Sequence, residues 1–236
     1  MTLNTAYIVD FDGTITTRDL SFELAAHYGA QAFLEINREY RLKKIPIRLW
    51  LQGIVKLLPG DMGQLYAKVF EWAEIRPGFE QFLEYANEYN CPVIVASDGF
   101  GFYIEPVLEY FGLCGKIDKI YRNNTFINRN GRLEVSNPHA HAVCPVCGNC
   151  KAAHVVGLKN KGLPVIYIGD GSNDRFGASW SDHVCARGKL AEICIEKGFT
   201  YSQWNDFYDI IKVDKPELKD RSAGSLCCPM GSGIKT

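Results

Sequence analysis

Two aspartates, Asp10 and Asp12, follow a short apolar run, AYIV, and precede a small, hydroxyl-bearing stretch. A buried strand that ends on two acids brings both carboxylates to the edge of a sheet. Two carboxylates held that close repel each other unless a cation or a shared proton relieves them. The spacing therefore predicts a metal site or an acid–base pair near the start of the chain.

Two further apolar runs, PVIVAS and PVIYIGD, also end in polar residues. In an open α/β sheet, ligands bind outside the carboxyl ends of the strands, so these ends are expected to meet in one crevice. Lys151 opens a helix just before the last run and adds a positive charge there. The polar groups predicted for the crevice, besides the first two aspartates, are Thr14, Ser97, Asp98, Gly99, Asp170 and Asp174.

Strands alternating with helices must position these groups. Continuously apolar runs of this kind are typical of parallel strands that are covered on both faces; they lie at residues 6–10, 92–97 and 164–170. Apolar residues at helical spacing predict helices at residues 79–89, 103–111, 151–160 and 189–197. The pattern indicates an α/β fold built on a doubly wound parallel sheet.

Residues 19–76 form a long stretch without a convincing strand, in which apolar residues recur at helical spacing and Pro46 and LPGD interrupt the pattern. We expect a small helical cap here, inserted after the first strand. The sheet domain is then expected to consist of residues 1–18 and 77–212. Residues 213–236, rich in Gly and Ser, are expected to form a flexible tail.

The composition is that of an ordinary globular chain, with 236 residues, 47% hydrophobic and 22% charged. No apolar run of about eighteen residues is present to span a membrane, and the start of the chain does not resemble a secretion signal, so a cytoplasmic location is expected. A formal net charge of −1 gives no general attraction to nucleic acid. The short basic cluster at Arg41, Lys43, Lys44 and Arg48 suits a solvated helix face or a contact with an anionic substrate.

Nine cysteines are many for a cytoplasmic chain, and three of them fall in CPVCGNC. Cys-x₂-Cys is a common zinc-ligand spacing. Structural zinc, a redox-sensitive disulfide and plain packed thiols are the three alternatives. The residues concerned are Cys144, Cys147 and Cys150, with His139 or His141 as a fourth zinc ligand. Because Lys151 follows directly, ordering of this segment by metal or disulfide would set the position of that lysine. Just upstream, Asn130-Gly131 within FINRNGRLEV predicts a β-hairpin.

DFDGT, a Ser after the second strand, a Lys ahead of the last strand and GDGxxD, in that order, resemble the four motifs of the haloacid dehalogenase superfamily of phosphotransfer enzymes. The resemblance covers about residues 5–212. It implies a Rossmann-like core and Mg²⁺ as cofactor. It also implies that Asp10 attacks phosphorus to form an aspartyl-phosphate, while Asp12 protonates the leaving alkoxide and then takes a proton from water.

The same resemblance implies a role for each remaining motif residue. Mg²⁺ would be held by Asp10, the backbone carbonyl of Asp12 and Asp170. Asp174 would be an outer partner of the metal or of Lys151. The groups expected around the phosphate are Phe11, Gly13, Thr14, Ser97, Asp98, Gly99 and Lys151.

Asp12 followed by Gly-Thr indicates ester hydrolysis, and a helical cap between the first two motifs resembles the phosphoserine phosphatase-like branch. Such a cap closes over a small phosphorylated metabolite and excludes water. Asp19 lies where that branch carries an acid that contacts the substrate's amine or hydroxyl. It suits the N-cap of the first cap helix equally well.

Within the branch, IRPGF, the PH before CGNCK, and DFYDI are similar to the 2-hydroxy-3-keto-5-methylthiopentenyl-1-phosphate phosphatases of methionine salvage. The chain departs from that pattern at Ser97-Asp98-Gly99, where Gly-Gly is expected after the Ser. Phosphoserine, phosphoethanolamine and phosphocholine phosphatases are alternatives, as is a phosphotransferase with the same intermediate.

Overall fold

A computed structural model describes residues 5–213, so nearly all of the predicted tail lies outside the described residues. The described chain contains a seven-stranded sheet with the order β4-β3-β2-β1-β5-β6-β7. All neighbouring strands in it run parallel except β3 and β4, which form the predicted hairpin. The strands are β1 Ala6–Val9, β2 Val93–Phe100, β3 Lys119–Ile127, β4 Leu133–Ser136, β5 Val165–Gly169, β6 His183–Ala186 and β7 Ser202–Gln203.

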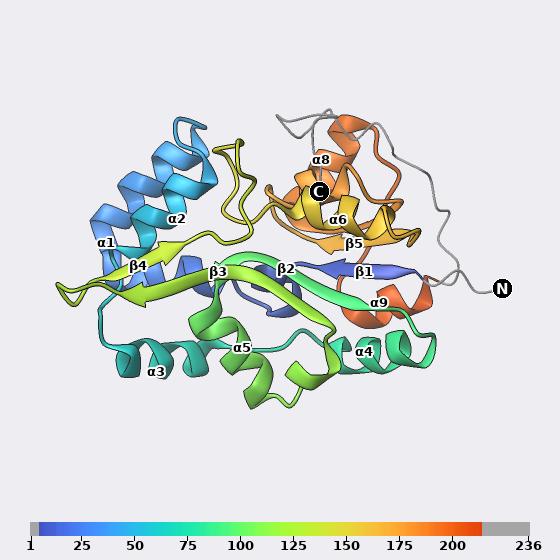
Figure 1. The fold of residues 1–236 in the computed structure, drawn as a ribbon, viewed down its shortest axis with the longest axis horizontal. Helices are drawn as coiled ribbons and strands as arrows, with labels where there is room; N and C mark the ends of the chain where they lie inside the picture. The colour runs from blue at the N-terminus through green and yellow to red at the C-terminus, as the bar shows by residue number, and fades with distance from the viewer. Residues whose placement is uncertain (1–4, 214–236) are drawn as a thin grey trace.

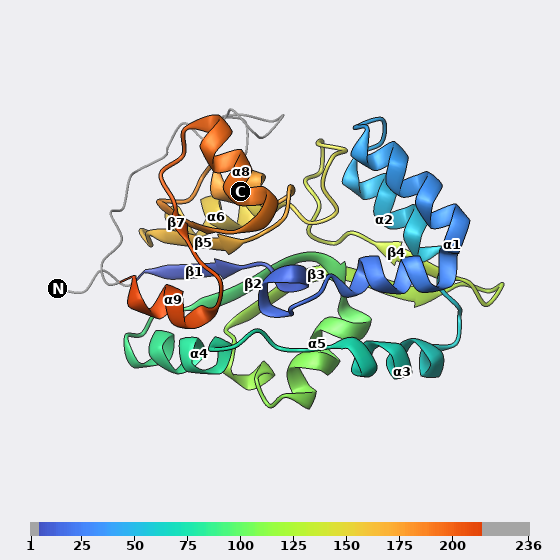
Figure 2. The same cartoon turned by 180° about the vertical axis from the view of Figure 1, so that it is seen from behind.

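Helices cover both faces of this sheet (Figures 1 and 2). α4, α5 and α9 lie on one face, and α6 and α8 lie on the other. The helices are α1 Leu20–Arg41, α2 Ile47–Val55, α3 Met62–Trp72, α4 Phe79–Glu88, α5 Gly101–Tyr110, α6 Lys151–Lys159, α7 Arg175–Ala178, α8 Gly188–Lys197 and α9 Phe207–Lys212. This arrangement confirms the predicted α/β class with a parallel sheet.

Strand β1 shows why the sheet is buried on both sides. Successive side chains of a strand point to opposite faces. Tyr7 and Val9 belong to the hydrophobic cluster beneath α4 and α5, and the ring of Phe82 packs edge-on against Tyr7 at 4.9 Å. Ala6 and Ile8 belong to the second cluster, with α6 and α8. Because hydrophobic clusters cover both faces of β1, every side chain of this strand has to be apolar.

Four helices, α1 to α4, separate β1 from β2, and the first three fall within the predicted range 19–76. Asp19 accepts a hydrogen bond from the backbone N–H of Phe22 and caps α1, and Asp61 caps α3 in the same way through the N–H of Gly63. Helix α3 reaches the sheet domain, where Phe70 packs against Tyr110 of α5 with ring centroids 5.2 Å apart. The domain boundaries within this region stay a prediction.

The sequence does not predict strands β6 and β7. β6 is HVCA and β7 is SQ, and neither gives a distinct apolar run. Strand β2 is also longer than expected and continues through Ser97 to Phe100.

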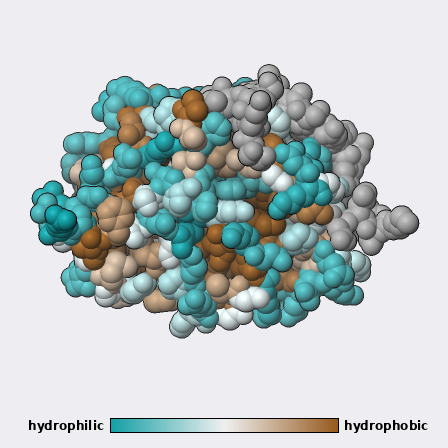
Figure 3. Space-filling view, viewed as in Figure 1, coloured by the Kyte–Doolittle hydropathy of each residue, from teal (hydrophilic) through white to brown (hydrophobic). Residues whose placement is uncertain are grey.

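On the face drawn in Figure 3, hydrophobic residues of the described chain form small areas separated by hydrophilic ones. No helix in residues 5–213 is both long enough and apolar enough to span a bilayer.

Candidate active site

The carboxyl ends of β1, β2 and β5 open into a cavity of about 190 Å³ that cap helices α1 and α2 cover. The crevice predicted from the strand ends therefore exists. Its polar lining includes Asp10, Asp12, Asp19, Ser97, Asp98, Gly99, Lys151, Asp170 and Asp174. Of the other predicted groups, Phe11, Gly13 and Thr14 form the turn directly behind the acids.

Asp10 and Lys151 form a buried ion pair at the floor of the cavity. Lys151 Nζ lies 2.8 Å from Asp10 Oδ1 and 2.7 Å from Asp174 Oδ1. Burial alone would lower the pKa of Lys151, but the two carboxylates raise it well above its ordinary value, so the lysine keeps its charge. Burial, together with Asp174, raises the pKa of Asp10. A fixed cation beside a buried carboxylate suits the binding of an anionic group.

Asp12 has a different environment from Asp10, although only one residue separates them. Its Oδ1 accepts the backbone N–H of Leu20 at 2.9 Å, and its Oδ2 accepts the hydroxyl of Tyr103 at 2.5 Å. Burial raises the pKa of Asp12 well above its ordinary value, and Asp19 adds to that rise. A carboxyl group whose pKa is raised holds its proton more firmly, which suits the protonation of a leaving group.

Tyr103 was missed by the sequence analysis, which placed it only within a helix. The sole local signal was a hydroxyl in the first turn of the helix that follows the second motif. Arg76, in IRPGF, was missed in the same way. Its buried guanidinium donates to the carbonyl oxygens of Gly13 and Thr14 and so holds the turn after β1 in place.

Two glycines allow the close approach of the acids. Gly13 has a φ of +77°, and a Cβ there would lie 2.7 Å from Asp170 Oδ2. A Cβ on Gly99 would collide with the hydroxyl of Tyr103 and with Asp12 Oδ2. The glycine positions of the first two motifs therefore follow from the packing of the catalytic candidates.

Ser97 is almost fully buried, and its Oγ accepts the N–H of Gly99 at 2.9 Å. Since that bond uses a lone pair of the hydroxyl, the proton of Ser97 stays available for an oxygen in the cavity. The neighbouring Asp98 is held by the N–H of Asn149 at 2.9 Å, and burial raises the pKa of its carboxyl. Both residues thus project from the end of β2 toward the site.

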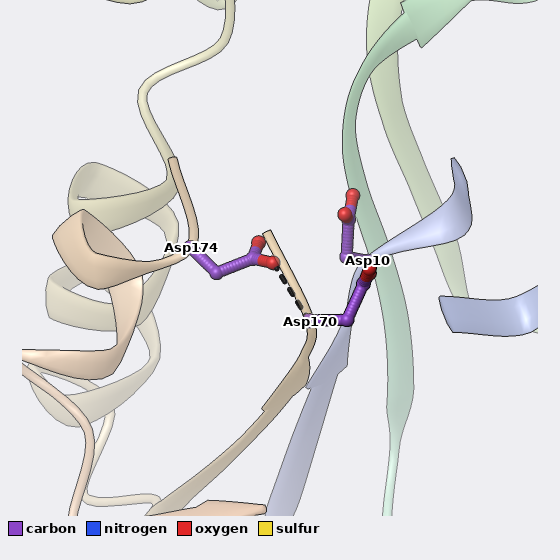
Figure 4. A group of neighbouring side chains, drawn as sticks. All are labelled: Asp10, Asp170 and Asp174. Atoms are coloured by element: carbon purple, nitrogen blue, oxygen red, sulfur yellow. Dashed lines mark hydrogen bonds between the residues drawn. The ribbon is translucent and has the colours of Figure 1, made fainter. Parts of the chain in front are cut away.

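The carboxylates of Asp10, Asp170 and Asp174 offer oxygen atoms within 4.8 Å of one another (Figure 4). Thr14 Oγ1 donates to Asp170 Oδ1 at 2.7 Å and orients that carboxylate. Burial and Asp174 raise the pKa of Asp170 to about 6. Oxygen ligands gathered with excess negative charge fit a hard divalent cation such as Mg²⁺.

Asp174 differs from the other two acids of this group, because protein donors already occupy both of its oxygens. Oδ1 accepts from Lys151 and from the hydroxyl of Tyr167, each at 2.7 Å. Oδ2 accepts the backbone N–H groups of Asp170, at 3.0 Å, and Gly171, at 2.7 Å. We therefore expect Asp174 to orient the lysine and the loop, and its direct ligation of a metal stays a prediction.

The cap supplies the apolar side of the cavity through Phe22, Ile47, Trp50 and Leu51. Of the basic cluster, Arg41 and Lys43 are exposed and are not part of the lining. Arg48 turns away toward the cysteine segment, residues 144–150, where its guanidinium donates to the carbonyl oxygens of Cys147, at 2.9 Å, and Cys144, at 2.8 Å. Asp19 lines the mouth of the cavity and also caps α1, so both of its predicted placements are compatible.

Cys144, Cys147 and Cys150 are buried, and within residues 5–213 no disulfide joins them. Over the same described residues, the one cluster of side chains with metal-ligand spacing is the aspartate group, so the three thiols and His139 do not converge. The His139 ring instead packs against Tyr121 at 4.9 Å. The packed-thiol alternative agrees best with this geometry.

Comparison with known proteins connects this site to a family. The family described as "Putative Phosphatase" matches residues 5–201. The chain belongs to this family. A 2-hydroxy-3-keto-5-methylthiopentenyl-1-phosphate phosphatase of Exiguobacterium sibiricum is 30% identical over 207 residues, which cover 86% of this chain and 93% of that protein.

A second relative is larger than this chain. The bifunctional enzyme MtnB/MtnX of Bacillus licheniformis is 33% identical over 217 residues, 90% of this chain. The match spans 50% of that enzyme, so this member of the phosphatase family has about half of its length.

Solved structures agree on the fold. A phosphoserine phosphatase, solved as an analogue of its phospho-aspartyl intermediate, superimposes with a TM-score of 0.71 at 20% identity, over 91% of this chain and all of the other. A substrate-bound phosphoserine phosphatase gives a TM-score of 0.67 at 18% identity, over 89% of this chain and 99% of the other. This family member therefore has the fold of the haloacid dehalogenase superfamily, as its motifs indicate.

Proposed function

We propose that this phosphatase hydrolyses a small phosphomonoester with the help of Mg²⁺ and through an aspartyl-phosphate on Asp10. The observation that carries the proposal is the pairing of Asp10 with the buried Lys151 at the floor of a cavity that also holds Asp12. A nucleophile, a cation for the phosphate and a proton donor are thus within one small space.

The residues of the chain account for both halves of the reaction. An oxygen of Asp10 attacks phosphorus, and the ester oxygen leaves with a proton from Asp12, whose raised pKa favours the protonated form. The ionised Asp12 then takes a proton from water while the water oxygen attacks the phosphorus of the acyl-phosphate. Phosphate departs and Asp10 is regenerated. Lys151 and the hydroxyl of Ser97 hold phosphate oxygens throughout.

Mg²⁺ would be held by Asp10 and Asp170, with the backbone carbonyl of Asp12, and when bound it supplies positive charge that offsets repulsion between the nucleophile and the phosphate. The cavity needs such a cation, because its lining contains six carboxyl groups and a single lysine. The acids are Asp10, Asp12, Asp19, Asp98, Asp170 and Asp174.

As substrate we propose 2-hydroxy-3-keto-5-methylthiopentenyl-1-phosphate, the ester named for the relatives. A cavity of about 190 Å³ suits a small metabolite, and Phe22, Ile47 and Trp50 offer an apolar wall for a methylthio end. A specific observation favours a second candidate class, the esters of amino alcohols: Asp19 and Asp98 both line the cavity and would attract an amine. A cytoplasmic location also stays a proposal.

Phosphate release from a panel of esters tests the proposal. The panel contains the methylthiopentenyl ester, phosphoserine, phosphoethanolamine and phosphocholine, each assayed with and without Mg²⁺. We expect one ester to have a far higher kcat/KM, and Asp10→Asn to abolish turnover. Hydrolysis that is unchanged in Asp10→Asn would refute the mechanism. Formation of phosphorylated products with added alcohols would indicate a phosphotransferase instead.

A further inference from the structure

The chain between β4 and α6 passes beside cap helix α2 before it delivers Lys151 to the site (Figures 1 and 2). Asn149, two residues ahead of the lysine, is only 1% exposed. Its side-chain nitrogen donates to the carbonyl oxygens of Ser97 and Tyr121, each at 2.9 Å. Its Oδ1 lies 2.6 Å from Nε2 of His154. The amide therefore has a partner for each of its two N–H groups and for its oxygen.

The position of these partners in the sheet explains the need for the amide. The pairing of β2 with β3 shifts register between Ala96 and Phe100, so Ser97 lies inside an irregularity of the ladder. Buried carbonyl oxygens that leave a regular ladder need other donors. Asn149 supplies one to Ser97, and Asn123 supplies one to the carbonyl of Asp98 at 2.6 Å.

The same side chain also fixes the start of α6. An amide oxygen can only accept, so Nε2 of His154 carries the hydrogen of that bond. Burial lowers the pKa of His154 to about 3, which keeps its ring neutral. The ring stacks on Tyr121 with centroids 3.8 Å apart. Since His154 lies in the first turn of α6, Asn149 links that turn to Ser97 of β2 and Tyr121 of β3.

We propose that Asn149 is a positioning residue for phosphate binding, because its amide holds Ser97 and the helix start that carries Lys151 in one arrangement. The inference rests on the proposed function. In this proposal Asn149, rather than a metal ion or a disulfide, is the group that orders the end of the cysteine segment. Asn149 itself does not touch the substrate; it acts through the serine and the lysine.

Binding of inorganic phosphate to the Mg²⁺-loaded protein, measured by calorimetry, tests this proposal without requiring turnover. In Asn149→Ala we expect the dissociation constant of phosphate to rise by about ten- to a hundredfold, the usual effect of removing a group that orients site ligands. Mg²⁺ affinity should change by less than about threefold, since the aspartates are not held by this amide. KM for the best ester should rise along with the phosphate constant.

Ser181→Ala is the matched control. Ser181 is fully buried, and its hydroxyl lies within hydrogen-bond distance of the carbonyl oxygens of Ala178, at 2.9 Å, and His183, at 3.0 Å, at the opposite end of the sheet. Its loss should lower the melting temperature and leave phosphate affinity unchanged. If Asn149→Ala does not fold, His154→Phe keeps a ring on Tyr121 but removes the donor, and phosphate affinity should fall about two- to tenfold.

The possible outcomes distinguish a failure of the positioning role of Asn149 from a failure of the proposed phosphatase function. Folded variants at both positions that bind phosphate as tightly as the parent would overturn the positioning role and leave the proposed phosphatase intact. Equal losses of phosphate and Mg²⁺ affinity would also overturn it, because they indicate general damage. A parent protein that binds no phosphate would overturn both proposals.

Discussion

Asp10 and Asp12 have the same chemistry in the sequence but different partners in the structure. Lys151 pairs with Asp10, whereas the hydroxyl of Tyr103 and a backbone N–H hold Asp12. The partner of each acid suits its proposed role. A cation beside the nucleophile attracts the incoming phosphate, and the hydroxyl that bonds to Asp12 adjusts the pKa of that acid. At this scale Tyr103 is the residue most in need of a test.

Tyr103→Phe removes one hydrogen bond that lowers the pKa of Asp12. The pKa of Asp12 should therefore rise further, and the basic limb of the kcat/KM profile should move to higher pH. Water activation needs ionised Asp12, so kcat at neutral pH should fall by about tenfold and aspartyl-phosphate should accumulate. Rapid-quench trapping and a pH–rate profile measure both effects. A profile that superimposes on that of the parent would contradict this role.

Hydrogen bonds join helices α1 and α2 to the segments that carry the site residues. Tyr40, near the end of α1, donates to Asn173 Oδ1 at 3.1 Å in the loop that carries Asp170 and Asp174. Arg48 of α2 holds the carbonyls of the cysteine segment. Both contacts lie beside the cavity, so hydrogen bonds connect α1 and α2 to the segments that carry the catalytic candidates.

Tyr40→Phe should loosen this closure without removing the ring that packs on Trp50 at 5.4 Å. We expect KM to rise about two- to tenfold, the effect of one neutral hydrogen bond, with little change in melting temperature. Steady-state kinetics and thermal unfolding measure the two quantities. Tyr28→Phe is the control, because its hydroxyl bonds to Gln64 of α3 within the cap. An equal KM change in both variants would argue against a specific contact.

The whole molecule concentrates negative charge at one edge of its sheet. Burial raises the pKa of Asp10, Asp12 and Asp98 as well as that of Asp170. A carboxyl whose pKa is higher in the folded state than in the unfolded chain binds its proton more tightly when folded. Ionisation of these acids therefore lowers the stability of the metal-free protein, and a bound cation should restore it.

Thermal unfolding with and without Mg²⁺ tests this balance. The pKa of Asp170 rises from 3.8 to about 6, so the metal-free melting temperature should fall as pH rises across that window. Mg²⁺ requires the ionised carboxylate, and its stabilising effect should grow over the same window, reaching about 2.7 kcal/mol at a hundred times its dissociation constant. Asp170→Asn should abolish the Mg²⁺ effect. A Mg²⁺ effect that is equal at pH 4 and pH 8 would contradict the prediction.

Much of the fold and of the site could be predicted from the sequence, because local patterns carry that information. The apolar runs of β1, β2 and β5 specify buried parallel strands, and such strands must bring their carboxyl ends together. The predicted location of Asp10, Ser97 and Asp170 in one crevice follows from this rule. The β3–β4 hairpin and helices α4, α5, α6 and α8 could be predicted for the same reason, because a turn dipeptide and helical spacing are also local patterns.

Only the tertiary structure decided which partners these residues have. Tyr103, Arg76 and Asn149 act through contacts between distant segments, and no spacing along the chain marks such contacts. The cysteine segment shows the same limit, because its spacing suits a chelate, whereas among the described residues its side chains do not form a group of three metal ligands. Side-chain chemistry and strand order are local properties, whereas a hydrogen-bond partner exists only once the chain has packed.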